Sequence, residues 1–349
     1  MADLTPKECF RRRLRMEETE YVPVFPRDLT LGIDAAGLRF DDFNVFDPKV
    51  SARCVLELQK MCGHDVTVGH IQVRELGAFG GKITRSTNGM PQLAVAPFAD
   101  IERMDEFQPE DGLDNMFWKR KESMEITSKT RPDLGLVFNT GAPFGTSMGL
   151  RGIEQFLMDS MLNPEIVDRL FVFGSRLANL YVEEGVTEDT DAVFLAAAYD
   201  NPDIVGDEIF SKYSVPGVKG IVKTSHDLGY PIIFHPHGVF STDDRHGLLA
   251  QCVDTGVDGM QFAESNEPEG FLYPEVDGKC AVLGGLDAYT SLLLGNPKRI
   301  FRDCDRNMDV LEGHAYIPMC SCSLHVGMPI ESLRLMVEAY HTYRERNPA

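Results

Sequence analysis

The chain has 349 residues, of which 43% are hydrophobic and 25% charged, and its formal net charge is -20. This is the composition of a globular protein with a large core, and a charge this negative argues against nucleic acid or an anionic membrane as a partner, because both bind clusters of lysine and arginine. No apolar stretch approaches the roughly 18 residues of a membrane span and no signal peptide is evident, so we expect a cytoplasmic protein.

Short apolar runs typical of β-strands recur along the chain, and segments with helical periodicity separate most of them. This alternation predicts a parallel sheet with right-handed crossovers. About eight such units fit a closed barrel, so we expect one α/β domain over residues 1–349, a (β/α)₈ TIM barrel. The expected strands are Val22–Phe25, Asp65–Gly69, Leu136–Asn139, Asp191–Ala196, Pro231–His235, Val257–Phe262, Ala281–Gly285 and Ala315–Pro318.

Two segments between the second and third expected strands decorate the barrel. Lys82–Pro97 alternates apolar residues around Asn88 and Gly89, a strong hairpin signal. Ala99–Met124 is acidic and predicts a helical excursion. The main helices are expected at Pro48–Cys62, Gly152–Glu184, Ile209–Leu228, Asp244–Asp254, Pro297–Leu311 and Pro329–Arg346.

Polar residues follow several of the expected strands at the end where barrel enzymes carry their chemistry. Asn139 begins a tight Gly/Pro turn after the third strand, and such a turn suits substrate contact. Tyr199, Asp200 and Asn201 follow the fourth strand and are further candidates for binding substrate.

Two acidic residues are candidates for a general acid or base. Glu264 follows the sixth strand and could also be a metal ligand, a hydrogen-bond acceptor for a ligand histidine, or a solvated loop residue. Asp287 follows the seventh strand, where capping the next helix is the alternative to a catalytic role, and one side chain could do both.

Metal-ligand side chains follow the fifth and eighth strands. His235 and His237 are two residues apart, a spacing that puts both on one side of a strand. Cys320 and Cys322 repeat this spacing, and the residues alone do not decide between them. Imidazole and thiolate from two strand ends can close around one Zn²⁺ and leave a coordination position open for substrate. The alternatives are a buried histidine beside a surface one, and small core cysteines.

These residues carry a resemblance to a known family. The chain resembles the uroporphyrinogen decarboxylase superfamily, and within it the zinc- and corrinoid-dependent methyltransferases. The resemblance implies a (β/α)₈ barrel, in agreement with the expected strands. The segments that carry it are residues 8–26, 140–144, 232–238, 282–287 and 316–333.

The two branches of this superfamily differ near the N-terminus. True uroporphyrinogen decarboxylases carry an Arg-rich signature that grips substrate carboxylates, and an aspartate after an early strand that holds the pyrrole nitrogens. Here residues 23–28 contain one arginine, Arg27, and the early strand end offers His70. The resemblance therefore implies the methyltransferase branch.

The methyltransferase branch typically places His-x-Cys after one strand and a cysteine after the last. The resemblance thus implies a zinc site of His235, His237 and Cys322, with histidine replacing the middle cysteine. A site poorer in thiolate is a stronger Lewis acid and better suits an oxygen substrate, such as a methyl ether.

We therefore expect a zinc-dependent methyltransferase that moves a methyl group between a small substrate, a methoxylated aromatic compound, and a corrinoid (cobalamin) carried by a separate protein. The chain lacks the Asp-x-His-x-x-Gly motif of cobalamin-binding proteins, in keeping with a separate partner. A metal-free decarboxylase-like lyase and a barrel that binds without catalysis remain alternatives. The sequence leaves open the direction of transfer and whether the chain forms a homodimer.

Overall fold

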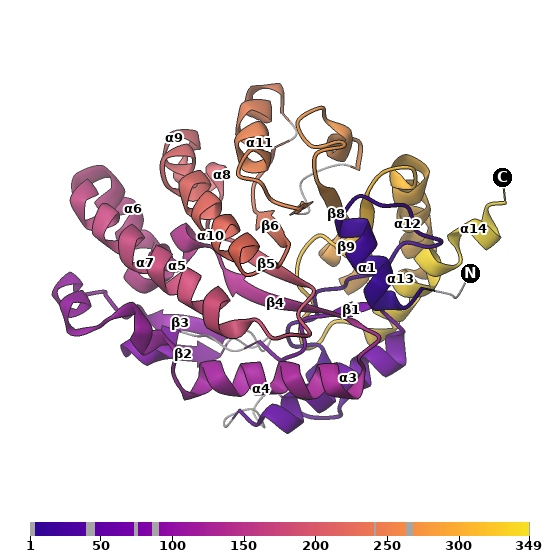
Figure 1. Ribbon diagram of the computed structural model, residues 1–349, viewed down its shortest axis with the longest axis horizontal. Helices are drawn as coiled ribbons and strands as arrows, with labels where there is room; N and C mark the ends of the chain where they lie inside the picture. The colour runs from indigo at the N-terminus through magenta and orange to yellow at the C-terminus, as the bar shows by residue number, and fades with distance from the viewer. Residues whose placement is uncertain are drawn as a thin grey trace.

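A parallel sheet forms the centre of the computed structural model, which describes residues 4–39, 46–72, 76–85, 91–240, 242–262 and 268–348. The sheet has seven strands in the order β1-β4-β5-β6-β7-β8-β9, and helices surround it (Figure 1). This confirms the expected α/β barrel architecture. The strands are β1 (Val66–Thr67), β4 (Gly135–Gly141), β5 (Ala192–Ala197), β6 (Ile232–Pro236), β7 (Gly259–Gln261), β8 (Ala281–Leu286) and β9 (Tyr316–Cys320).

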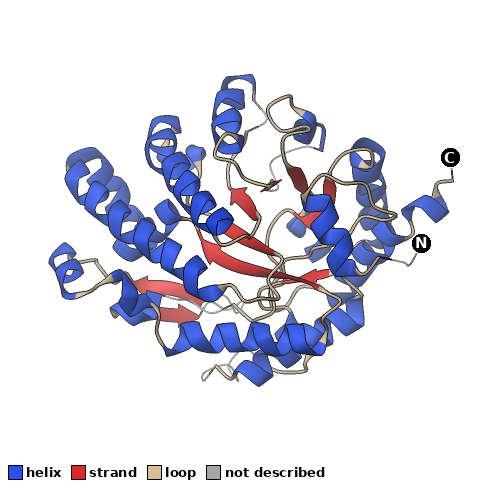
Figure 2. Ribbon diagram, in the orientation of Figure 1, coloured by secondary structure: helices blue, strands red, loops and turns tan. Residues whose placement is uncertain are grey.

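Most of the helices lie on the outer side of this sheet, and both termini lie on one side of the molecule near α1 and α14 (Figures 1 and 2). The helices are α1 (Pro6–Leu14), α2 (Gly32–Ala35), α3 (Pro48–Cys62), α4 (Asn115–Thr130), α5 (Pro143–Arg151), α6 (Ile153–Leu162), α7 (Pro164–Gly185), α8 (Pro202–Val205), α9 (Asp207–Ile209), α10 (Val215–Asp227), α11 (His246–Val253), α12 (Pro297–Leu311), α13 (Ile330–His341) and α14 (Tyr343–Arg346).

The strands are apolar on both faces because helices cover one face and the barrel interior fills the other. Inward-facing residues such as Phe194, Ile233 and Leu283 form one buried cluster, which Phe10 and Leu14 of α1 join. Their strand neighbours belong to a second, larger cluster that includes residues of the surrounding helices. Because side chains alternate along a strand, residues two apart share a face. A residue's place in this alternation decides whether a polar side chain points into the barrel.

The expected first strand, Val22–Phe25, is not a strand of the sheet. It forms a single bridge, between Phe25 and Met319 of β9. Pro23 and Pro26 have no backbone N–H, so the segment cannot build a continuous ladder. It nevertheless joins the sheet edges, since Phe25 N donates to Pro318 O at 2.9 Å and Asp65 N donates to Val24 O at 3.1 Å.

Several expected helices are divided. Gly152–Glu184 is two helices, α6 and α7, because Pro164 cannot continue α6 and instead occupies the first turn of α7. In Ile209–Leu228, a π-helical turn, Phe210–Ser214, precedes α10. The other two divided segments are Asp244–Asp254, where α11 starts after a 3-10 turn, and Pro329–Arg346, which contains α13 and α14.

The two segments that were expected to decorate the barrel also form regular structure. Strands β2 (Lys82–Arg85) and β3 (Pro91–Val95) pair antiparallel, apart from the main sheet (Figure 2). The Asn88-Gly89 turn expected between them lies outside the described residues. The expected helical excursion consists of two 3-10 helices, Ile101–Glu106 and Pro109–Gly112, followed by α4.

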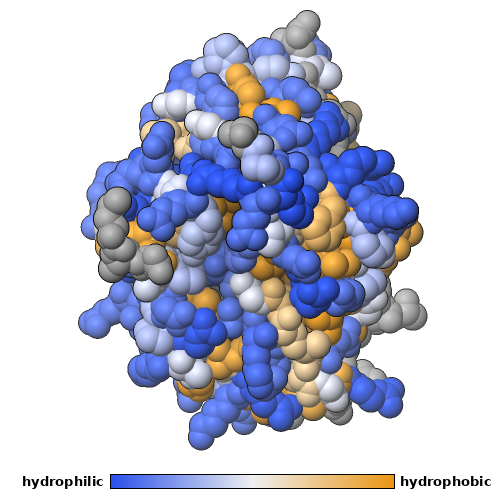
Figure 3. Space-filling model, turned by 90° about the vertical axis from the view of Figure 1, so that its right-hand side faces the viewer, coloured by the Kyte–Doolittle hydropathy of each residue, from blue (hydrophilic) through white to orange (hydrophobic). Residues whose placement is uncertain are grey.

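The surface is that of a charged protein. Hydrophilic side chains cover most of the face shown in Figure 3, and apolar residues form small patches between them. Among the described residues, none of the helices combines the length and the apolar character that crossing a membrane would need.

Candidate metal centre

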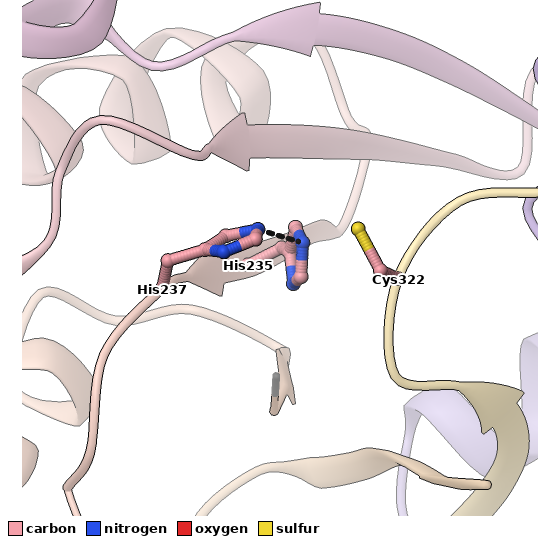
Figure 4. Close-up of side chains that lie close together, drawn as sticks. All are labelled: His235, His237 and Cys322. Carbon is pink, nitrogen blue, oxygen red and sulfur yellow. Dashed lines mark hydrogen bonds between the residues drawn. The ribbon is translucent and has the colours of Figure 1, made fainter. Parts of the chain in front are cut away.

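Three side chains from two distant segments meet at the C-terminal end of the sheet. The ligand atoms of His235, His237 and Cys322 all lie within 4.8 Å of one another. The two histidines come from the end of β6 and the residues after it, whereas Cys322 comes from the loop after β9, and all three point toward one another (Figure 4). The structure thus brings together the three residues that the sequence predicts as ligands.

Strand β6 fixes the position of His235. The residue has the same parity as the inward-facing Ile233, so its ring points into the barrel, and it is 1% exposed. Its Nδ1 lies 3.3 Å from the backbone oxygen of Gln261, and its Nε2 lies 3.0 Å from Nε2 of His237. Burial holds the pKa of His235 well below its ordinary value, and the nearby charge of Arg27 acts in the same direction.

The turn after β6 places His237. Gly238 has a φ of 110°, which an L-residue rarely adopts, and a Cβ there would lie 2.6 Å from Oδ1 of Asn201. The residue must therefore be glycine for the chain to pass Asn201 while His237 turns back toward His235.

The structure separates the two cysteines that the sequence could not. Cys320 is fully buried, and its Sγ lies 2.7 Å from the backbone oxygen of Pro26 and 2.8 Å from that of Cys322, either of which can accept its one S–H. Burial raises the pKa of its thiol. Cys322 lies beyond the strand, is partly exposed, and directs its Sγ into the cluster. Cys320 is thus packed into the fold, whereas the thiol of Cys322 is available to the cluster.

A buried cation stands beside the cluster. Arg27 is 6% exposed, has a left-handed backbone with a φ of 48°, and lies over the ring of Phe194 at 4.5 Å. Its Nε donates to Oδ1 of Asn139 at 3.2 Å. Burial lowers the pKa of Arg27, while the nearby Cys322 and Cys320 oppose that shift. Asn139, a predicted substrate-binding residue, is therefore linked to the site by its hydrogen bond with Arg27.

The other predicted substrate residues make contacts within the fold. Asp200 is fully buried, accepts from Oγ of Ser214 at 2.6 Å, and burial raises its pKa to about 6. Asn201 caps α8 by accepting from the backbone N–H of Asp203 at 2.8 Å. Tyr199 is partly exposed and lines a cavity of about 390 Å³ between β3, α5 and α6.

The two acidic candidates have different outcomes. Asp287 accepts from the backbone N–H groups of Tyr289 and Thr290, so it caps the π-helical turn after β8, the alternative that the sequence allowed. Glu264 lies outside the described residues.

Sequence reasoning missed three polar residues near the cluster. The Oγ of Ser323 lies 3.9 Å from Sγ of Cys322 and 2.9 Å from Nε2 of His325, whose pKa burial lowers to about 4. Gln261 ends β7 and contacts His235 through its backbone. Gln261 lies two residues after Gly259, so both face the same side of the strand, toward the barrel interior. This alternation is the feature of the sequence that could have identified it.

The donor set fits a zinc ion. Two imidazoles and one thiolate are borderline and soft ligands of the kind zinc prefers, and three protein ligands are the number found in catalytic sites. Tetrahedral ligands of zinc lie about 3.3–3.6 Å apart, given Zn–N and Zn–S distances of about 2.0–2.3 Å. The ligand atoms of the cluster lie within 4.8 Å of one another, close enough to surround one ion.

Comparison with known proteins gives a consistent result. The model of the family described as uroporphyrinogen decarboxylase (URO-D) matches residues 5–343. Two proteins named methylcobamide:CoM methyltransferase MtbA are similar over 99% of this chain and 100% of their own length. The one from Methanosarcina acetivorans is 22% identical over 363 residues, and the one from Methanosarcina mazei is 22% identical over 364 residues.

Solved structures support the fold. A methyltransferase from Methanosarcina mazei superposes with a TM-score of 0.84 at 17% identity, covering 98% of this chain and 99% of that one. A B12-independent methionine synthase from Shewanella sp. W3-18-1 gives a TM-score of 0.56 at 10% identity, covering 93% of this chain and 97% of that one.

Proposed function

Because the chain belongs to the uroporphyrinogen decarboxylase family, we propose that it is a methyltransferase of that family, which moves a methyl group between a small substrate and the corrinoid of a separate protein. The observation that carries this proposal is the cluster of His235, His237 and Cys322 at the C-terminal end of the sheet. The names of two full-length relatives, both methylcobamide:CoM methyltransferases, support it.

His235, His237 and Cys322 would hold one Zn²⁺. Bound there, zinc would supply Lewis acidity to the heteroatom that gives up or receives the methyl group. The chain's own contribution is to orient the ligands: the backbone oxygen of Gln261 faces Nδ1 of His235, and the Gly238 turn directs His237 inward.

For the substrate we favour a methoxylated aromatic compound, with O-demethylation as the reaction. The nitrogen-rich donor set supports an oxygen substrate, since harder ligands make a stronger Lewis acid. The names of the relatives support a second candidate, transfer of the methyl group from the corrinoid to a thiol such as coenzyme M. In both reactions the corrinoid protein would approach the C-terminal end of the strands, where the cluster lies.

One observation favours a different class of reaction. Arg27 is a buried guanidinium that donates to a neutral amide, Asn139, and it lies in the N-terminal segment where decarboxylases of the family carry arginines. A metal-free lyase acting on an acidic ring compound would use such a cation. Under that reading Arg27→Met abolishes activity, whereas removal of metal leaves activity unchanged.

Metal content and methyl transfer test the proposal together. Zinc is measured in the purified parent and in His235→Ala and His237→Ala, with circular dichroism to verify folding. We expect about one zinc per parent chain, the count of one catalytic site, and loss of zinc in both variants. Parent enzyme is then mixed with Co(I) cobalamin and methoxybenzoates, or with methylcobalamin and mercaptoethanesulfonate, and the cobalamin spectrum is followed. A zinc-free, folded parent would refute the proposal.

A further inference from the structure

Gln261 lies where the two ligand-bearing parts of the site could be joined. It is the last residue of β7, fully buried, and faces the barrel interior like Gly259 two residues earlier. Strand β7 pairs with β6, which carries His235, and is separated by β8 from β9, which leads to Cys322. One residue at this position can therefore contact both segments.

The backbone of Gln261 contacts the first segment. Its carbonyl oxygen lies 3.3 Å from Nδ1 of His235. A carbonyl oxygen only accepts hydrogen bonds, so this contact requires the proton on Nδ1 and leaves the lone pair on Nε2. Nε2 is the atom that faces His237, and it is the atom that a metal in the cluster would bind.

The side chain of Gln261 contacts the second segment. Its Nε2 reaches past β8 and lies 3.0 Å from the backbone oxygens of both Cys320 and Ser321, the residues that precede Cys322. It also lies 2.9 Å from the oxygen of its neighbour Phe262. The reverse orientation of the amide would set its oxygen against three carbonyl oxygens, so the donor position is fixed by chemistry.

Packing alone does not account for an amide here. The Oε1 of Gln261 is buried and has no hydrogen-bond partner in the part of the chain that the structure describes. An unsatisfied buried acceptor is unfavourable, and leucine, of similar bulk, would avoid it. What the amide adds is the set of contacts that its Nε2 makes with the end of β9.

We propose that Gln261 is a positioning residue that holds the two halves of the metal centre together. Its carbonyl fixes the tautomer and ring orientation of His235, while its amide fixes the strand end from which Cys322 projects. This rests on the zinc site proposed above. Residues that orient metal ligands in this way typically change metal affinity about 10- to 100-fold when they are altered.

The test compares two buried glutamines. Gln261→Leu removes the amide but keeps the backbone carbonyl. Gln59→Leu is the matched control, because Gln59 is 6% exposed and its Nε2 likewise donates to a backbone oxygen, that of His64, but it lies on α3 outside the sheet. Zinc affinity is measured by competition with a chromophoric chelator, Co²⁺ spectra report the geometry of the site, and urea unfolding of the metal-free proteins reports stability.

We expect Gln261→Leu to bind zinc about 10- to 100-fold more weakly, with a weakened thiolate-to-Co²⁺ charge-transfer band, whereas Gln59→Leu keeps the parent affinity and spectrum. Equal affinity in the parent and Gln261→Leu, or equal losses in the two variants, would overturn the role of Gln261. If Gln261→Leu does not fold, Gln261→Glu, which puts an acceptor in place of the donor, is judged by the same criteria. A parent that binds neither ion would refute the metal centre itself, and this proposal with it.

Discussion

The Nε2 atoms of His235 and His237 lie 3.0 Å apart across a single intervening proline. Without an ion between them, two lone pairs repel at that distance, so one ring would donate a proton to the other. The contact between Nδ1 of His235 and the Gln261 carbonyl makes His237 the donor. A metal held through both Nε2 atoms would therefore need that proton to move to Nδ1 of His237.

Replacing the two neighbouring cysteines should have opposite effects on zinc content. Cys322→Ala removes the Sγ that points into the cluster and should lose zinc while staying folded. Cys320→Ala removes a buried thiol that donates to Pro26 O, so it should retain zinc but lower the free energy of unfolding by about 1–3 kcal/mol. Elemental analysis and urea unfolding measure the two quantities. Loss of zinc from Cys320→Ala alone would reverse the assignment of the ligand.

Gly238→Ala should disturb both stability and metal binding. The φ of 110° and the 2.6 Å approach of a Cβ to Asn201 Oδ1 predict a cost of about 1–3 kcal/mol, together with displacement of His237 and weaker zinc binding. Gly220→Ala is the control, because Gly220 lies within α10 and a Cβ there meets nothing within 4 Å. That variant should gain about 0.5–1 kcal/mol and keep its zinc. Equal stabilities of the two variants would contradict the argument.

Asp200 and Tyr199 are adjacent in sequence but should behave differently. Asp200→Ala leaves Oγ of Ser214 without its buried acceptor and should destabilise the fold by about 1–3 kcal/mol. Tyr199→Ala enlarges the cavity between β3 and α5 and should raise KM more than it lowers kcat. Chemical denaturation and steady-state kinetics separate the two effects. A Tyr199→Ala variant with unchanged KM would exclude that cavity as a substrate site.

Acid should destabilise the fold through buried histidines. Burial lowers the pKa values of His64 and His70 from 6.5 to about 3, so the unfolded chain takes up protons that the folded chain excludes. The stability present above pH 6.5 is therefore lost as the pH falls toward about 3. His64→Leu removes one of these proton-binding side chains. It should reduce the slope of the free energy of unfolding against pH, between pH 4 and 6, by about 1.4 kcal/mol per pH unit. Unfolding at a series of pH values measures this slope, and the parent and His64→Leu should have the same slope above pH 7.5.

The sheet could be predicted because its strands are short apolar runs buried on both faces. Seven of the eight expected strands overlap strands of the sheet. The first does not, since Pro23 and Pro26 prevent a ladder whatever the apolar pattern suggests. The pairing of Phe25 with Met319 depends on the closure of the whole barrel, which no local pattern contains.

The site was predictable only in part. The parallel strands β6 and β9 end on one side of the sheet, so His235, His237 and Cys322 could be expected to converge. The choice of Cys322 over Cys320 depended on where β9 ends: with Ile317 and Met319 facing inward, Cys320 faces outward. The contacts of Asp200 and Asn201 could not be predicted, because the turn after β5 brings these residues to Ser214 and to the start of α8.

Closure of the barrel by the segment around Phe25 has a consequence for the order of assembly. Phe25 bonds to Pro318, and Pro26 accepts from the thiol of Cys320, so the first and last parts of the chain meet beside the cluster. Such contacts between distant residues form late, because the intervening chain must first be ordered. Cys322 follows β9, so a chain still attached to the ribosome lacks it until the strands of the sheet have been made. At the proposed metal site, the two histidines are therefore made before their third ligand, and coordination by all three would follow synthesis of β9.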